Sequence, residues 1–378
     1  MDSKEGKSEM QMDAAATSKD TAARKRKKRA YRIGKKAEEA SVRKTVKETR
    51  RRAPILYEST YHVFEEHRYE FNKWWMEDWA ISSVPWSKNN RNLICTTTCD
   101  ADAAAIPSVR FTDVASGMAY VDTAATLQPF EVKISPKENS GLTWPLHVYG
   151  YVAARDLIDY KRNIIFEREK DNCQIITDEL RFPYLALTGP ARAVVLLDPV
   201  YFEIDLKVKG IGQSEDQDLI FIASSFTNPF PDESALFKRT FKGKISTVEL
   251  TFGQISKSVE AAVSMQVVHG SWPDGFRGCF AAKTASINDL TIGLLVIGDN
   301  GLTLADDGTI KLQRHVVCAE ITNREYLEVS VGAYGVGGQR FDGTLYFTPQ
   351  ERGRLNGALH VGTCEIEVSV TWSLIMSF

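Results

Sequence analysis

The chain has 378 residues, enough for two domains with a substantial buried core. Apolar residues make up 43% of it, yet no apolar run reaches the roughly 18 to 20 residues of a membrane helix, so we expect no contact with a membrane. The formal net charge of −2 conceals an uneven distribution along the chain.

Residues 1–54 form a basic tail, with 18 Lys and Arg against 8 Asp and Glu, whereas the remainder carries 29 basic and 41 acidic residues. The first 20 or so residues of the tail show no periodicity, and an Ala-, Glu- and Lys-rich stretch follows from Arg24, which predicts a disordered segment or a fluctuating helix. Two basic runs in it are candidates for nuclear import or phosphate contact. They comprise Arg24, Lys25, Arg26, Lys27, Lys28, Arg29, Arg50, Arg51 and Arg52.

Three roles remain open for this tail. It is an import signal, or it binds nucleic acid through residues 24–52 by releasing counterions, or it is a solubilising segment that contacts the acidic body. The first thirty residues lack the apolar segment of a secretory signal, and the chain has no Asn-x-Ser/Thr acceptor. We therefore expect an intracellular protein, in the nucleus, the cytoplasm or both.

Residues 55–80 carry aromatic side chains at spacings of three and four, which predicts an amphipathic helix from about 56 to 79. We expect its aromatic stripe to pack on the β body or on an unidentified protein partner. The candidates for this docking helix are Tyr61, Phe64, Phe71, Trp74 and Trp75.

Residues 81–141 resemble a linker with short strands, and residues 142–378 resemble a β domain built from one unit used twice. Gly150–Arg155 matches Gly278–Lys283, and Tyr201–Ile204 matches Tyr326–Val329, at nearly constant offset. Weaker matches follow between Leu250–Phe252 and Leu345–Phe347, and between Val259–Ser264 and Cys364–Ser369. The predicted units are about 142–270 and 274–378.

Alternation of apolar and charged residues within these blocks has the period of a half-buried strand. Asp-Asn-Gly and Asp-Asp-Gly segments supply hairpin turns. We therefore predict a mainly β fold, an antiparallel β-sandwich with a disordered basic tail and one amphipathic aromatic helix. The two units differ by apparent insertions at 214–244 and 350–358, which are the expected carriers of specificity.

Several blocks, including Leu146–Gly150, Leu187–Arg192 and Tyr201–Lys207, together with Val370–Ser373, resemble a plant domain of unknown function that is abundant in grasses. The resemblance covers roughly residues 140–376. Some members of that family carry a ribosome-inactivating domain, and others are labelled jasmonate-induced-like. The resemblance implies a stress or defence setting and assigns no catalytic residue.

No motif for catalysis or for a cofactor stands out. Two Glu-x-x-Arg sequences, at Glu65–Arg68 and Glu351–Arg354, match part of an rRNA N-glycosidase site. Too little ordered chain precedes the first to complete a cleft, and the second lies in a predicted loop. The six cysteines are scattered, and Cys95 and Cys99 lack a second ligand pair at zinc spacing, so we expect no metal and no cofactor.

We therefore interpret the chain as a non-catalytic β-sandwich interaction module. The alternatives are an rRNA N-glycosidase-type defence protein and a nucleic-acid binder that acts through its basic tail.

Overall fold

The computed structural model describes residues 55–56, 63–65, 68–75, 106–113 and 121–377, the last range without 159–160, 178–182, 198, 211–214, 231, 288–289, 323–324 and 336. For residues 55–56, 63–65 and 377 it describes the backbone alone. The basic tail with its candidate residues from Arg24 to Arg52 lies outside these ranges, as does Tyr61.

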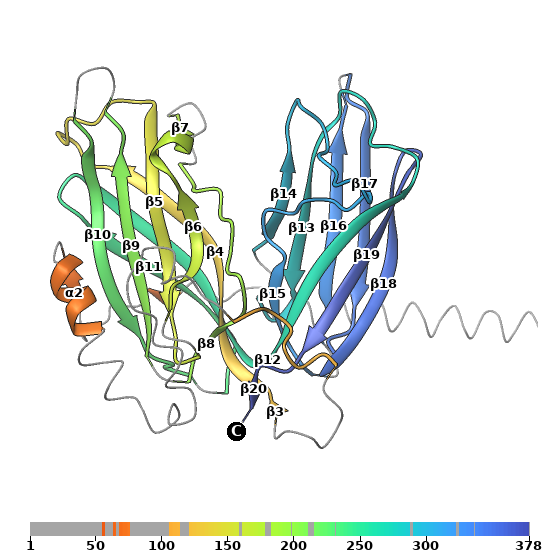
Figure 1. Ribbon diagram of the computed structural model, residues 1–378, viewed down its shortest axis with the longest axis horizontal. Helices are drawn as coiled ribbons and strands as arrows, with labels where there is room; N and C mark the ends of the chain where they lie inside the picture. The colour runs from red at the N-terminus through yellow and green to blue at the C-terminus, as the bar shows by residue number, and fades with distance from the viewer. Residues whose placement is uncertain are drawn as a thin grey trace, which may run out of the picture. The chain divides into compact units, whose positions relative to one another are not determined.

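The described chain is mainly β and forms two sandwiches, whose strands pair antiparallel except for a short parallel pairing of β1 with β11 (Figure 1). In the first sandwich one sheet has the order β2-β10-β9-β5-β6, with β7 also on β5, and the other has β11, β12, β4 and β8 side by side, with β1 on β11. Its elements are β1 (Ile55–Leu56), β2 (Val63–Glu65), α2 (Arg68–Trp74), β4 (Ala124–Pro136), β5 (Leu146–Arg155), β6 (Asn163–Arg168), the 3-10 turn η5 (Lys170–Asn172), β7 (Gln174–Ile176), β8 (Val194–Val195), β9 (Val200–Val208), β10 (Gln217–Phe226), β11 (Ala235–Lys242) and β12 (Ser246–His269).

In the second sandwich one sheet has the order β14-β13-β16-β17, and the other sets β15, the end of β12, β19 and β18 side by side. Its elements are β13 (Arg277–Thr284), the 3-10 turn η7 (Ala285–Ile287), β14 (Ile292–Ile297), β15 (Val316–Glu320), β16 (Leu327–Tyr334), β17 (Arg340–Phe347), β18 (Arg352–Val361) and β19 (Cys364–Ser373). A separate two-stranded ribbon joins β3 (Val121–Asp122) to β20 (Met376–Ser377).

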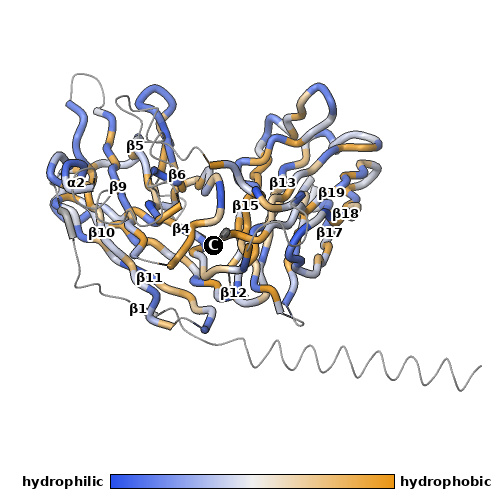
Figure 2. Tube along the Cα trace, turned by 60° about the horizontal axis from the view of Figure 1, so that its bottom comes forward, coloured by the Kyte–Doolittle hydropathy of each residue, from blue (hydrophilic) through white to orange (hydrophobic). Residues whose placement is uncertain are grey.

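Strand β12 belongs to both sandwiches. Its first part pairs with β11 and β4, and its last part pairs with β15 and β19. The pairing with β4 shifts register between Ile255 and Ser258, where Lys257 takes a left-handed backbone with φ of 42°. Apolar residues concentrate along β4 and β12 (Figure 2), and each sandwich buries its own core. Buried residues include Val152, Phe202, Ile204 and Phe252 in the first core, and Phe280, Val329, Val331 and Val368 in the second.

The two sandwiches repeat one strand order, with β10-β9-β5-β6 matching β17-β16-β13-β14. The two clearest sequence matches fall on corresponding strands, Gly150–Arg155 on β5 with Gly278–Lys283 on β13, and the second match on β9 with β16. Common ancestry of the two units stays an inference from the sequence.

The structure contradicts the weaker sequence matches between the two units and the two predicted insertions. Val259–Ser264 and Cys364–Ser369 lie on β12 and β19, which are neighbours in one sheet rather than counterparts. Residues 214–244 contain β10 and β11, and residues 350–358 contain most of β18, so both stretches are strands that have a counterpart in the other sandwich. Glycines in β18 suggested a loop. At Gly357, however, a Cβ atom would lie 2.8 Å from the end of the Leu345 side chain on β17, so this side chain would have to move if a larger residue replaced the glycine.

The predicted helix from 56 to 79 also differs from the structure, because Ile55–Leu56 and Val63–Glu65 are strands and the helix spans only Arg68–Trp74. Edge pairing with β11 and β10 outweighs the helical spacing there. The predicted linker contains β4, a strand of 13 residues. Its Pro129 lies where the pairing with β12 slips by a residue, a position at which a strand tolerates proline.

Candidate interaction surface

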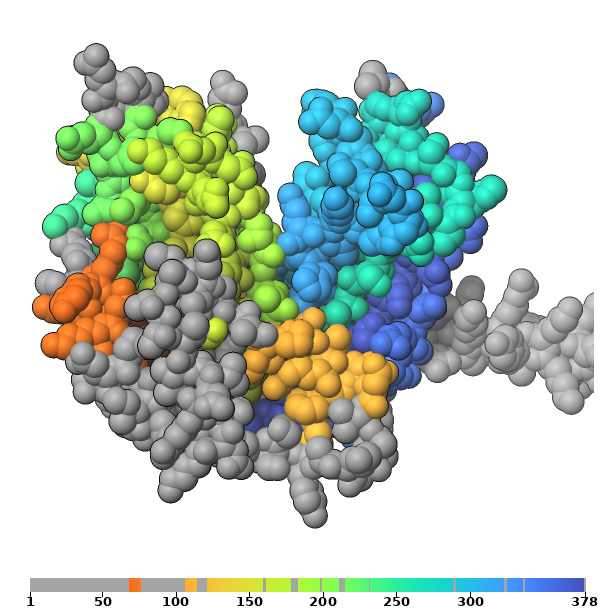
Figure 3. Space-filling model, viewed as in Figure 1, coloured from red at the N-terminus to blue at the C-terminus, as the bar shows by residue number. Residues whose placement is uncertain are grey.

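The N-terminal segment covers the first sandwich in three places. β1 pairs with β11 at Phe237 and Lys238, β2 pairs with β10 at Ile222–Ser224, and α2 contacts β10. Figure 3 shows α2 in orange against the green surface of these strands. Both edge strands, β10 and β11, are therefore shielded by the chain itself.

Aromatic side chains anchor α2. Phe71 and Trp75 are buried and form a small core with Tyr201, Phe221 and Ala223. The Trp75 and Tyr201 ring centroids lie 5.4 Å apart in an edge-to-face arrangement, a favoured geometry for aromatic pairs.

Of the residues predicted for a docking helix, Phe71, Trp74 and Trp75 thus face the chain's own sheet, with Trp74 partly buried against the same small core. Phe64 lies on β2, where only the backbone is described, and Tyr61 lies outside the described residues. Three of the five candidates therefore contact the chain's own first sandwich.

Arg68 holds the helix by charge. Its Nε and Nη2 atoms donate to the two carboxylate oxygens of Asp205 at 2.6 and 2.7 Å, and Nη2 also reaches Asp218 at 3.0 Å. The guanidinium lies 5.1 Å from the centroid of the Phe221 ring. Its hydrogen bond lowers the pKa of Asp218 and keeps that carboxyl charged.

A buried polar network lies beside this small core. Glu203 accepts from Tyr151 Oη at 2.7 Å, from Arg155 Nε at 2.9 Å and from Arg162 Nη2 at 2.8 Å. Burial alone would raise the pKa of Glu203, but the two arginines outweigh it and hold the pKa below its usual value. Both carboxylate oxygens of Glu203 thus accept hydrogen bonds, and two arginines balance the buried charge.

In the part of the chain that the structure describes, the second sandwich has no equivalent cover. Among the described residues no strand pairs with the outer edge of β17 or of β18, which are 8 and 10 residues long. Two aromatic residues on this side are exposed. Tyr334, at the end of β16, is 46% exposed, and Tyr346, within β17, is 65% exposed. We call these two edges, together with the hollow described next, the open side.

A hollow of about 490 Å³ lies where both edge strands meet the end of the sandwich. Phe276 and Phe341 form its apolar wall, with ring centroids 5.5 Å apart, and Arg340 and Thr363 also line it. Its volume falls in the range of small-ligand sites, and its wall suits an apolar or aromatic group. No local pattern in the sequence indicates this hollow, because its residues come from three separate segments.

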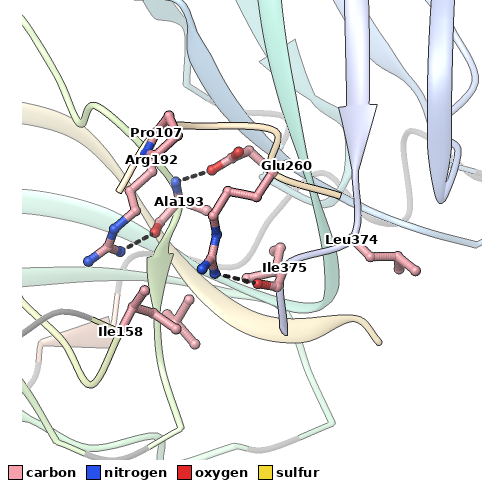
Figure 4. A pocket seen from close by; sticks show the side chains of 9 residues that line it. Pro107, Ile158, Arg192, Ala193, Glu260, Leu374 and Ile375 are labelled. Atoms are coloured by element: carbon pink, nitrogen blue, oxygen red, sulfur yellow. Dashed lines mark hydrogen bonds between the residues drawn. The ribbon is translucent and has the colours of Figure 1, made fainter. Parts of the chain in front are cut away.

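A second, narrow cavity lies where β12 passes between the sandwiches and has room for little more than a water molecule (Figure 4). Glu260 is buried beside it and accepts hydrogen bonds from the backbone N–H groups of Val109 and Ala193. Burial raises the pKa of Glu260. The buried Arg192, also at this cavity, donates to both oxygens of Asp156 at 2.7 and 2.8 Å. The arrangement joins four chain segments, and the cavity leaves no space for a substrate.

In the described part of the chain, the arginines of both Glu-x-x-Arg sequences form ion pairs with distant aspartates. Arg68 is bound to Asp205 and Asp218, and Arg354 lies on β18 and pairs with Asp113 at 3.4 Å. Within the described ranges no three His, Cys, Asp or Glu residues are grouped to hold a metal ion. None of the helices described there is long and apolar enough to cross a bilayer.

Residues 126–370 match the family described as domain of unknown function DUF6598. No curated protein sequence matches the chain. The chain is similar to two solved structures, each at a TM-score far below that of a shared fold. The human GIVD cytosolic phospholipase A2 is 8% identical with a TM-score of 0.25, over 68% of this chain and 31% of that one, so this chain spans about a third of that enzyme. The pair of C2 domains of extended-synaptotagmin 2 is 9% identical with a TM-score of 0.22, over 72% of this chain and 99% of that one.

Proposed function

The chain belongs to the family of the domain of unknown function DUF6598, and we propose that it is a non-catalytic interaction module that binds a protein partner at the open side of its second sandwich. One observation carries this proposal. Strands β10 and β11 are shielded by β2 and β1, whereas no described residue pairs with the corresponding edges of β17 and β18. Edge strands of this length are usually covered, shortened or interrupted in soluble proteins.

Capture of partners from plant tissue extract tests this function. We compare the wild-type chain with Phe341→Arg, which places a charge in the apolar hollow, and with Tyr69→Arg on the exposed face of α2, where Tyr69 is 78% exposed. Proteins that the wild type and Tyr69→Arg retain, and that Phe341→Arg loses while its unfolding temperature is unchanged, support the proposal. Equal capture by all three chains refutes it.

The buried carboxylates of Glu203 and Glu260 accept hydrogen bonds from other groups of the chain, which supports the non-catalytic part of the proposal. Incubation with intact ribosomes followed by aniline treatment tests it. We expect no specific rRNA cleavage. A discrete aniline-dependent fragment would instead establish the N-glycosidase alternative.

We also propose that the basic tail directs the chain to the nucleus, on the strength of the two basic runs within its +10 charge. The stress or defence setting rests on the family resemblance alone. A reporter fused to residues 1–54 should concentrate in nuclei, and one in which Arg24–Arg29 are replaced by alanine should not. A reporter that stays evenly distributed would remove the import role.

A further inference from the structure

We propose that the partner binds the open side by adding a short extended apolar segment to β17 and β18, as residues 55–65 add β2 and β1 to β10 and β11. This inference rests on the proposed function and names the class of partner, which the function itself leaves open. Backbone hydrogen bonds to an exposed sheet edge are a recurrent mode of peptide recognition.

The register of the strands locates the contact. On the first sandwich β2 covers Ile222–Ser224, and Ile222 lies opposite Ile204 of β9. On the second sandwich, Leu345 lies opposite Val329 of β16. In the matched sequence blocks, Val329 is aligned with Ile204. The site that corresponds to the β2 contact is therefore Leu345–Phe347 on β17.

The charges along the open side favour an apolar segment. Arg340 pairs with Asp342, and Arg354 pairs with Asp113, so these charged groups are already balanced within the chain. A partner strand needs no opposite charge there and would lose affinity by burying one of its own. The strands that cover the first sandwich are likewise mostly apolar, Ile-Leu in β1 and Val-Phe-Glu in β2.

The partner does not need a helix like α2. On the first sandwich, the small residue Ala223 lies under α2 and opposite Glu203. On the second sandwich, the corresponding residue is Tyr346, which lies opposite Glu328. Tyr346 packs edge-to-face on Tyr326 at 5.3 Å and so fills that space from within the sheet. The segment's anchor is instead an aromatic or large apolar side chain in the hollow, against the wall formed by Phe276 and Phe341.

The test uses a fluorescein-labelled synthetic peptide of residues 54–67, which contains both covering strands, added to the full-length chain. We expect saturable binding, together with amide hydrogen exchange slowed about tenfold in β17 and β18 and unchanged in β13 and β14. A peptide of the same composition in scrambled order is the control. Phe341→Arg should weaken binding about tenfold if the hollow holds the anchor.

Two results would overturn the inference. Peptide binding without slower exchange in β17 and β18 would place the contact elsewhere, and this measurement needs no variant that might misfold. Concentration-dependent dimerisation of the full chain that protects the same edges would make a second copy, rather than a separate protein, the occupant. If the peptide fails to bind while Phe341→Arg still loses captured partners, the proposed function stands and only the partner class is wrong.

Discussion

The fold raises the pKa of the Glu325 carboxyl group to near neutral pH. The group is half-buried, one of its oxygens has no hydrogen-bond partner, and burial together with the nearby Glu320 raises its pKa to about 7. Glu320 accepts a 2.5 Å hydrogen bond from the Ser234 hydroxyl, which comes from the segment just before β11. A titrating group thus lies beside a contact between segments of the two sandwiches.

The contribution of Glu325 to the stability of the protein should therefore fall as the pH rises from about 4.5 to about 7. A folded pKa above the unfolded value contributes stability that is fully present below about pH 4.5 and is lost as the pH rises through about 7. Allowing for solvent screening, we expect the chain to lose about 1 kcal/mol between pH 5 and pH 8 through this group. Urea unfolding of Glu325→Gln at both values checks this: the variant should lack that loss, and an exposed-site control, Glu351→Gln, should retain it. Identical pH profiles for all three chains would contradict the assignment.

At the scale of elements, α2 stabilises the first sandwich through its aromatic residues more than through its charges. Trp75 is 1% exposed and packs on Tyr201, and the Arg155 guanidinium lies 5.1 Å from its ring centroid. Arg68, in contrast, keeps about a third of its side chain exposed, so its ion pairs are screened by solvent.

Trp75→Ala should accordingly destabilise the protein by about 3 kcal/mol, as is usual when a buried tryptophan is truncated. Arg68→Ala should cost about 1 kcal/mol or less. Denaturant midpoints of the two variants measure the difference. A larger loss for Arg68→Ala would show that α2 is held by charge.

The sequence predicted the β class and much of the strand pattern, because alternation specifies a strand that is buried on one face. In β19, for example, Ile366, Val368 and Val370 are buried and the residues between them are not. It also indicated the aromatic anchors of α2. The features that it missed depend on contacts between distant segments. The helical spacing of residues 56–79 carries no information about the edge of β10, and pairing with that edge makes Val63–Glu65 a strand.

The open side was missed for the same reason. Gly353 and Gly357 disfavour a strand locally, and only the fold shows that Gly357 lies against the Leu345 side chain. Glu260 lies within a matched sequence block, but its partners, the N–H groups of Val109 and Ala193, come from segments far away in the sequence. Local patterns specify which face of a strand is buried; they do not specify which edge stays unpaired.

At the scale of the whole molecule, the chain combines a basic tail with an acidic body, and the two sandwiches use one strand order differently. The first is completed by residues 55–75, and the second keeps two long edges that no described residue covers. The strands that cover the edges of the first sandwich thus indicate what kind of segment the edges of the second sandwich can bind.

The 24-residue strand β12 supplies a central strand to one sheet of each sandwich. We expect the two sandwiches to unfold together, and a chain break at Lys257, between the two parts of this strand, to destabilise both. Calorimetry should accordingly record one heat-absorption peak, whereas two peaks would show independent halves. The boundary between the two sandwiches therefore lies within a strand and not in a loop.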